Sequence, residues 1–348
     1  MRHLTRKITV GDRAIGGDSP ISIQSMTKTK TSNIEATVNQ ILELEIAGCD
    51  IIRVAVPDEP AAEALPAIRR RIHIPLVADI HFSHKLAIMA IDAGVDKIRI
   101  NPGNIGDAEK VRQVLEKASE KQVAVRIGVN AGSIEKDVAR NYGGATAEAM
   151  VESALRHVRL CEQYGFSNIV ISMKASDVTT MIQAYQIIAE KIDYPLHLGV
   201  TEAGTPRLGL IKSAIGIGAL LSQGIGDSIR VSLTADPLKE IEAGQDILQA
   251  LNMSQDKVTI ISCPTCGRLD VNLFKIVNEV EEKVRTIKKN LKVAIMGCVV
   301  NGPGEAREAD IGVACGNKKG VLFKKGKVLR TVAEELIADE LYDEICKM

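Results

Sequence analysis

Three cysteines in the last quarter of the chain have the type and spacing of metal ligands. Cys263 and Cys266 form a C-x-x-C pair in CPTCGR, and Cys298 lies in GCVVNGPGE. The pair alone is compatible with half of a zinc site, a redox-active dithiol or part of an iron–sulfur cluster. A zinc ribbon needs a second C-x-x-C, which the sequence lacks, and the downstream Cys298 argues against a thioredoxin-like pair. These features favour an iron–sulfur cluster.

Glu305 extends the cysteine pattern. Three thiolates suit a [4Fe–4S] cluster in which one iron has no cysteine ligand. Glu305 follows the Gly-Pro-Gly turn at 302–304 and can reach back as an oxygen ligand, although a solvated carboxylate is the ordinary role of such a residue. The other four cysteines are isolated in expected strands or helices, which predicts small buried side chains.

A second set of polar residues interrupts the apolar segments between residues 50 and 235. Most come in pairs two residues apart, so that both side chains point to one face of a strand. The candidate site residues of this set are Arg53, Asp79, His81, Arg99, Asn101, Arg126, Asn130, Ser172, Lys174, Glu202, Arg230 and Ser232.

Five members of this set are cations on five different segments: Arg53, Arg99, Arg126, Lys174 and Arg230. Each would cost several kcal/mol if buried alone, whereas a shared polyanion offsets that cost. Guanidinium groups match phosphate oxygens, so the predicted ligand is a diphosphate; a dicarboxylate would not need five cations.

The carboxylates and the histidine of the set have a different expected role. Asp79 and Glu202 are predicted to face the uncharged part of the substrate or to transfer protons. His81 is either a ligand contact or a hydrogen-bonded structural residue.

The elements that must position these residues repeat along the chain. Apolar runs, each followed by a polar cluster and a helical pattern, lie at 22–27, 49–56, 75–82, 97–103, 124–132, 168–176, 195–204 and 227–234. Eight such repeats predict a (β/α)8 TIM barrel of the α/β class, with the cations at its carboxyl-terminal mouth. A doubly wound sheet is the alternative, less favoured because the spacing is even.

A different pattern follows the barrel. Strands are expected at 257–262, 292–298 and 309–316, a hairpin over 321–332, and helices over 271–290 and 334–347. We therefore predict a barrel domain at 1–253 that binds substrate and a small α+β domain at 254–348 that holds the cluster.

Composition excludes several classes of partner. Lys and Arg total 44, as do Asp and Glu, and aromatic residues make up 3% of the chain. This balance argues against binding to nucleic acid or to a membrane surface. No apolar run is long enough to span a membrane and no secretory signal is evident, so we expect a cytoplasmic protein.

The motifs resemble those of a known family. MTKT, ADIHF, RINPGN, VRIGVNAGS, SMKASD, GVTEAG, CPTCGR and GCVVNGPGE are similar to segments of the 4-hydroxy-3-methylbut-2-enyl diphosphate synthase family, along nearly the whole chain. The resemblance implies reductive opening and dehydroxylation of 2-C-methyl-D-erythritol 2,4-cyclodiphosphate in isoprenoid synthesis, with two electrons from ferredoxin or flavodoxin. It also implies a cluster domain of the sulfite-reductase type and the short bacterial form of the chain.

The resemblance carries residue roles as well. It implies Cys263, Cys266, Cys298 and Glu305 as ligands of a [4Fe–4S] cluster. It implies that the substrate is bound by Arg53, Arg99, Asn101, Arg126, Asn130, Lys174, Arg230 and Ser232.

The segment that joins the two domains predicts a shared active site. A helix over 235–253 would be about 28 Å long and would return the chain to the closed end of the barrel. Ser254 to Asp256 then span only about 10–11 Å. A cluster that serves the mouth is therefore expected from a partner chain in a head-to-tail homodimer.

Two rival functions remain at this point. One is a phosphate-binding aldolase or synthase barrel with a structural zinc in its tail. The other is a non-enzymatic cysteine module that binds nucleic acid, which the zero net charge disfavours.

Overall fold

The computed structural model describes residues 2–254, 257–298 and 308–348. They form two compact units, Met1–Leu251 and Asn252–Met348, and each is described by itself. The division expected from the sequence, at 253/254, lies close to this boundary.

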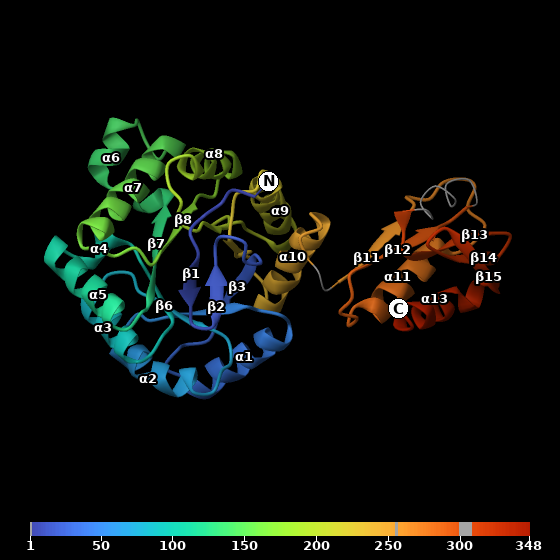
Figure 1. The fold of residues 1–348 in the computed structure, drawn as a ribbon, viewed down its shortest axis with the longest axis horizontal. Coiled ribbons are helices and arrows are strands. Elements are labelled where there is room, and N and C mark those ends of the chain that lie inside the picture. Colours follow the sequence, from blue (N-terminus) through green and yellow to red (C-terminus); the bar gives the residue numbers. More distant parts are fainter. Residues whose placement is uncertain (1, 255–256, 299–307) are drawn as a thin grey trace. The chain divides into compact units, whose positions relative to one another are not determined.

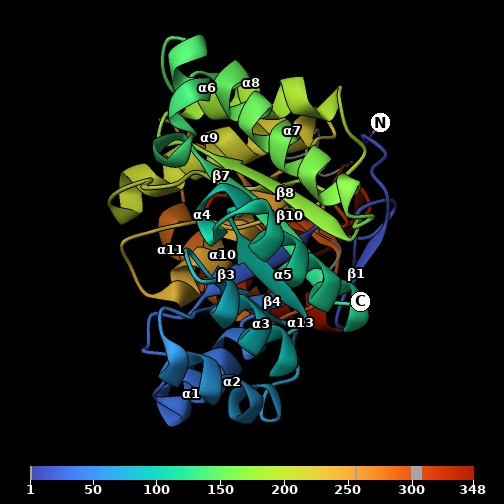
Figure 2. The ribbon, with the colours of Figure 1, turned by 90° about the vertical axis from the view of Figure 1, so that its left-hand side faces the viewer.

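The first unit is a parallel β-barrel surrounded by helices (Figures 1 and 2). Its strands are β3 (Ser22–Met26), β4 (Ile51–Ala55), β5 (Leu76–Asp79), β6 (Lys97–Ile100), β7 (Ala124–Asn130), β8 (Ile169–Lys174), β9 (His197–Leu198) and β10 (Ser228–Ile229). They pair in the order β8-β7-β6-β5-β4-β3-β10-β9, and a parallel bridge between Ile171 and Leu196 joins the two ends. All eight runs expected from the sequence are strands, and the TIM-barrel prediction is confirmed.

Helices cover the outside of the barrel. They are α1 (Ile34–Ile46), α2 (Glu59–Arg69), α3 (His84–Asp92), α4 (Pro102–Ile105), α5 (Ala108–Glu120), α6 (Lys136–Asn141), α7 (Ala147–Gln163), α8 (Val178–Ala189), α9 (Pro206–Ser222) and α10 (Pro237–Ala250), with a 3-10 turn at Ala131–Ser133. Polar residues in the loops start them: Asp58, Asp107 and Asp177 each accept a hydrogen bond from a first-turn amide. Among the described residues, no helix is long and apolar enough to cross a membrane.

Alternation along the strands separates an apolar shell from a polar interior. Ile98 and Ile100 of β6 pack in the large core between strands and helices. Lys97 and Arg99 of the same strand therefore point into the barrel. The same alternation places Arg126 inside and its neighbours Val125 and Ile127 outside.

A short antiparallel hairpin, β1 (Ile8–Val10) and β2 (Arg13–Ile15), precedes the barrel strands. The sequence analysis did not anticipate it. Its side chains Ile8, Val10 and Ile15 pack against the early interior positions of the barrel strands, which include Val77 and Ala124. The hairpin thus closes the amino-terminal end of the barrel with an apolar layer, and Figure 1 shows it within the ring of strands.

The second unit is a five-stranded mixed sheet with helices. Its strands β11 (Val258–Ser262), β12 (Leu291–Met296), β13 (Ile311–Gly316), β14 (Lys319–Lys324) and β15 (Lys327–Ala333) pair in this order, the first three in parallel. The sheet is accompanied by α11 (Leu273–Val284), a 3-10 turn at Glu334–Leu336 and α13 (Ile337–Cys346). Val280 and Leu341, one from each helix, belong to its buried core. The expected α+β architecture is confirmed.

Candidate active site

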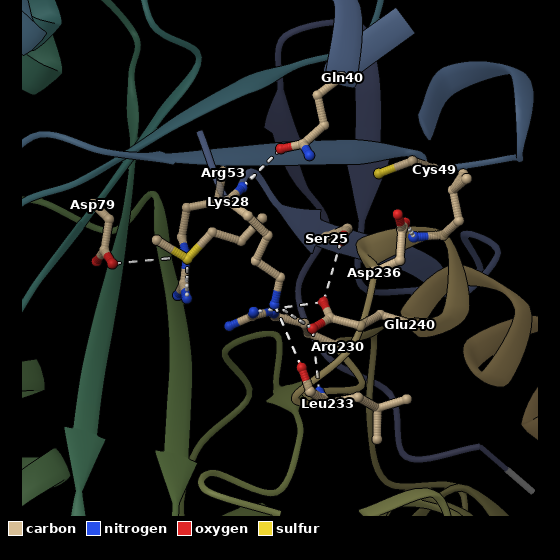
Figure 3. A network of polar contacts seen from close by, with 12 residues as sticks. Ser25, Lys28, Gln40, Cys49, Arg53, Asp79, Arg230, Leu233, Asp236 and Glu240 are labelled. Carbon is tan, nitrogen blue, oxygen red and sulfur yellow. Dashed lines mark hydrogen bonds and ion pairs between the residues drawn. The ribbon is translucent and has the colours of Figure 1, made fainter. Parts of the chain in front are cut away.

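Asp79, at the end of β5, is the carboxylate at the centre of the interior cations. It is 5% exposed, and its Oδ1 lies 3.3 Å from Arg99 Nη1. Its Oδ2 lies 3.8 Å from Arg53 Nε (Figure 3). Burial alone would raise the pKa of Asp79, but the neighbouring cations, Arg53 foremost, hold that pKa well below its usual range. Asp79 is therefore an ionised acceptor and not a proton donor.

Arg126 and Lys174 lie deep in the barrel, and neither forms an ion pair with a carboxylate of the described residues. Arg126 is 1% exposed, and its Nε and Nη1 have no hydrogen-bond partner among the described residues. Burial, followed by repulsion from Arg53 and Arg99, lowers the pKa of Arg126 well below its ordinary value. Burial and repulsion from Arg230 likewise lower the pKa of Lys174. Such a concentration of buried positive charge is what an anionic ligand would relieve.

Two glycines make room for these cations. A Cβ on Gly128 of β7 would stand 2.5 Å from Arg99 Nε, and one on Gly199, after β9, would stand 2.8 Å from Lys174 Nζ. Any side chain at either position would displace a cation, so the glycines are part of the site's construction.

Arg230, just after β10, is oriented from α10. Its Nη2 lies 3.5 Å from Glu240 Oε2, and Glu240 also accepts hydrogen bonds from Lys28 Nζ (2.9 Å), Ser25 Oγ (3.3 Å) and the Leu233 amide (3.2 Å) (Figure 3). Burial and a neighbouring guanidinium lower the pKa of Arg230 to about 10. Glu240 is thus a buried anchor that fixes one of the five cations.

The remaining polar candidates surround this group. His81 is half exposed and its Nε2 lies 3.5 Å from Asp79 Oδ2. Asn101 Nδ2 donates to Ser133 Oγ at 3.5 Å, and the Asn130 amide donates to the same oxygen at 3.3 Å. In register, Ser172 and Lys174 of β8 pair with Gly128 and Asn130 of β7, which places them on one interior face. Ser232 is half-buried, two residues beyond Arg230.

Glu202 differs from the other candidates. It is exposed in the loop after β9 and has φ of +51°, in the left-handed region that favours glycine. Within the described residues its side chain makes no ion pair with the interior cations. The structure therefore brings Asp79 together with the cations and does not bring Glu202 to them.

Several interior residues were missed by the sequence analysis: Gln24, Lys97, His197, Ser228 and Glu240. Lys97 stands two residues before the candidate Arg99, on the same strand face, so period-2 alternation could have found it. Glu240 is indistinguishable in sequence from a solvated helix carboxylate, and no signal pointed to it.

The three candidate cluster ligands line one cavity in the second unit. Cys263, Cys266 and Cys298 border a space of about 140 Å³ beside the ends of β11 and β12. The Gly297 amide donates a hydrogen bond to Cys263 Sγ at 3.3 Å. Thr265, between the paired cysteines, has φ of +67°, a strained conformation for a β-branched residue. The donor set and the backbone amide fit an iron–sulfur cluster.

The fourth candidate ligand, Glu305, lies outside the described residues. Among those that are described, no three His, Cys, Asp or Glu side chains stand close enough together to hold a single metal ion. A cubic cluster spreads its ligands over several irons, so thiolates around one cavity suit it better than they suit a tetrahedral zinc ion.

Comparison with models of protein families identifies the family of the chain. A model described as the GcpE TIM-barrel domain matches residues 5–245, and one described as the GcpE protein C-terminal domain matches residues 259–347. The chain belongs to the GcpE family. This result confirms the resemblance inferred from the motifs.

Relatives of the GcpE family chain are similar over its full length. One from Caldanaerobacter subterraneus subsp. tengcongensis is 59% identical over 348 residues, with 100% of this chain and 98% of the relative covered. One from Clostridium tetani is 60% identical over 344 residues, with 99% of each covered. Both are named 4-hydroxy-3-methylbut-2-en-1-yl diphosphate synthase (flavodoxin).

Solved structures resemble the GcpE barrel in fold alone. The 3-dehydroquinate dehydratase from Geobacillus kaustophilus has a TM-score of 0.52 at 14% identity and covers 72% of this chain and 98% of its own. The dihydropteroate synthase from Yersinia pestis has a TM-score of 0.50 at 15% identity, with 72% and 99% covered. Both support the barrel and carry no information on the reaction of this chain.

Proposed function

We propose that the chain is an iron–sulfur oxidoreductase that converts 2-C-methyl-D-erythritol 2,4-cyclodiphosphate, two electrons and a proton into 4-hydroxy-3-methylbut-2-enyl diphosphate and water. The observation that carries the proposal is the interior cation cluster, defined as Arg53, Arg99, Arg126, Lys174 and Arg230. Within the part of the chain that the structure describes, its carboxylate partners are Asp79 and Glu240. A diphosphate supplies the missing negative charge. The names of the relatives agree with this assignment.

The barrel residues bind and orient the substrate in this proposal. The interior cation cluster holds the two phosphates, and Asn101, Asn130, Ser172 and Ser232 line the mouth as hydrogen-bonding groups. Asp79 stays ionised and accepts a hydrogen bond from a substrate hydroxyl, with His81 beside it. Glu202 reaches the substrate only if its loop moves, so Asp79 is the better placed carboxylate in this structure.

The second unit would carry the redox cofactor. Cys263, Cys266, Cys298 and Glu305 would hold a [4Fe–4S] cluster, which when bound supplies single electrons and a Lewis-acidic iron. Flavodoxin is the proposed donor because the relatives bear its name, and ferredoxin is the alternative. These soluble donors suit a cytoplasmic enzyme.

We place the substrate and the cluster of one active site on different chains of a head-to-tail homodimer. Glu240, in the first turn of α10, lies beside Arg230 at the mouth, and the fourteen-residue helix then runs about 21 Å toward the closed end. The chain leaves the barrel there. A stripe of exposed apolar side chains on α9, Leu208, Ile211 and Ile215, is suited to a contact between subunits.

The direct test is anaerobic purification followed by assay. We expect four irons and four sulfides per chain, a brown chromophore, and product formation from the cyclodiphosphate with reduced flavodoxin. Stoichiometric zinc without labile sulfide would instead favour the aldolase-type barrel with a structural zinc.

Complementation tests the shared site. Arg230→Ala, with a defective barrel, and Cys263→Ser, with a defective cluster, are co-expressed under different tags and the mixed dimer is isolated. In the proposed arrangement one of its two sites is intact, so activity returns to roughly half of the wild-type value. A verified mixed dimer no more active than the single variants would overturn the arrangement.

A further inference from the structure

Beneath the interior cation cluster lies a second set of buried polar residues, Gln24, Lys97 and His197, which we call the lower tier. Each stands two residues before a residue that touches the cluster. Gln24 precedes Met26, whose sulfur lies 2.9 Å from Arg53 Nη2, and Lys97 precedes Arg99. His197 precedes Gly199, which packs against Lys174. The alternation of the strands therefore directs the lower tier into the barrel, one step closer to its closed end.

The lower tier is fully enclosed and its polar atoms are not satisfied by the protein. Lys97 and His197 are 0% exposed and Gln24 is 1% exposed. Lys97 Nζ, His197 Nε2 and both amide atoms of Gln24 have no hydrogen-bond partner in the described parts of the chain. His197 Nδ1 is 3.0 Å from Ser228 Oγ. Buried polar groups are nearly always paired, so this concentration requires an explanation.

The hairpin prevents the lower tier from reaching water at the closed end. In register, Lys97 is flanked by Val77 and Ala124, and both belong to the apolar layer formed with Ile8, Val10 and Ile15. Lys97 therefore extends from an apolar layer into the barrel interior. The charged groups that act on it are Arg126 and Arg53 from the interior, and Asp96 from its own strand end, which acts most weakly.

We propose that Lys97 is a positioning residue that takes up one proton from solvent when a diphosphate occupies the interior cation cluster, and that its ammonium group then adds positive charge beneath the bound ligand. The inference rests on the proposed function and deepens it, because it assigns a role to a residue that the binding set does not include.

The charges explain why the proton arrives with the ligand. Burial without a hydrogen-bond partner, and then repulsion from Arg126 and Arg53, lowers the pKa of Lys97 well below its ordinary value, which favours the neutral amine in the free protein. A diphosphate on Arg126 and Arg53 cancels the repulsion and adds attraction, which raises the pKa of Lys97. The same burial lowers the pKa of His197, with Arg126, Lys174, Lys97 and Arg53 acting in the same direction, so the imidazole is neutral.

The reaction itself gives the added proton a use. Opening the cyclic diphosphate frees a phosphate oxygen, so the bound diphosphate gains a negative charge as the product forms. A protonated Lys97 beneath Arg126 offsets that charge in a site where water cannot do so.

Calorimetry of ligand binding provides the test. The cyclodiphosphate is titrated into the oxidised holoenzyme without reductant, at pH 8, in two buffers that differ in ionisation enthalpy. The ligand's phosphate oxygens are strongly acidic and stay ionised, and a free imidazole is neutral at this pH. We expect net uptake of protons on binding, of which Lys97 contributes about one per site, and an affinity that falls by up to about tenfold per unit rise in pH for each proton taken up.

Three variants assign the proton. Lys97→Met should bind about tenfold or more weakly, take up about one proton fewer per site and show a shallower pH dependence, while melting no lower than wild type because an unpaired buried amine has been removed. His197→Gln and the surface control Lys121→Met should retain the full uptake. Binding to wild type without proton uptake, or uptake that is undiminished in Lys97→Met, would overturn this inference alone. Absence of binding would overturn the proposed function with it.

Discussion

The barrel interior and the cysteine cavity are built in opposite ways. In the barrel, strand alternation directs the cations inward, glycines make room for Arg99 and Lys174, and Glu240 orients Arg230. These side chains are largely buried without a ligand. At the cavity, Cys266 is exposed and Cys263 and Cys298 are half-buried, on loops that follow strand ends. One site is preformed by its scaffold, whereas the other presents thiols around a space that a cofactor would organise.

The difference follows from the chemistry of the two ligands. Weakly directional ionic contacts gain strength only where water is excluded, so the cations have to lie deep. Metal–thiolate bonds are strong and supply their own geometry, so loops can carry the ligands. We therefore expect damage at the cavity to be all-or-none and damage in the barrel to be graded.

The largest expected effect is on the cluster. Cys263→Ser should lose the iron–sulfur chromophore and all turnover, because the thiolates hold the cluster. Glu305→Ala should keep the chromophore and lose most turnover. The exposed Cys346, on α13, provides the matched control, and Cys346→Ser should change neither iron content nor rate. Full activity of Glu305→Ala would reduce Glu305 to a surface carboxylate.

In the barrel, Lys174→Ala and Arg230→Ala should weaken substrate binding and leave the cluster spectrum intact. Loss of a desolvated charge partner costs about 2–5 kcal/mol, or roughly 30-fold to several thousand-fold in affinity. Lys121→Ala, at the exposed end of α5, should bind normally. If either interior variant failed to assemble the cluster, the separation of the two sites would be wrong.

A smaller effect is expected on the pH dependence of stability, through Asp79 in the barrel. Asp79 has a folded pKa below its unfolded value, so its ion pairs stabilise the fold above about pH 4 and this contribution fades as the pH falls further. Asp79→Asn should therefore lower the stability of the free protein by about 2–3 kcal/mol at neutral pH. The difference between wild type and variant should shrink below about pH 4. Melting curves at pH 7 and pH 3.5 measure it, and an equal difference at both values would exclude ionised Asp79 as the cause.

The smallest expected effect concerns Tyr185, a buried residue of α8. The Tyr185 hydroxyl accepts from the Met173 amide at 2.9 Å and donates to the His197 carbonyl at 2.5 Å, which ties β8 to β9. Tyr185→Phe should cost about 1 kcal/mol and lower the melting temperature by roughly 2–4 °C. The exposed Tyr142→Phe should melt like wild type. A variant that lost its chromophore would show that the two regions are not independent.

The fold was predictable because its pattern is repetitive. Each interior strand is apolar on its outer face and is followed by a helix that an aspartate, asparagine, serine or threonine begins, so eight strands could be identified from the sequence. The amino-terminal hairpin could not, because two strands of three residues leave too short a periodicity to recognise.

The site residues were predictable where a charged side chain interrupts an apolar segment. Arg99 and Arg126 attract attention because a charge in an apolar run needs a reason. Lys97 has the same signal but begins its strand, where a lysine is commonly solvated. The role of Glu240 becomes visible only in the fold, which brings α10 beside Ser25 and Arg230. Ser25 and Glu240 lie 215 residues apart in the sequence.

The amino-terminal hairpin gives the barrel a single entrance. Ligand, water and protons must all pass the same mouth, and a seated diphosphate blocks that route behind it. A proton that Lys97 takes up as the ligand enters is therefore retained until the ligand leaves. Proton and ligand share one route because a hairpin strand of three residues covers the opposite end of the barrel.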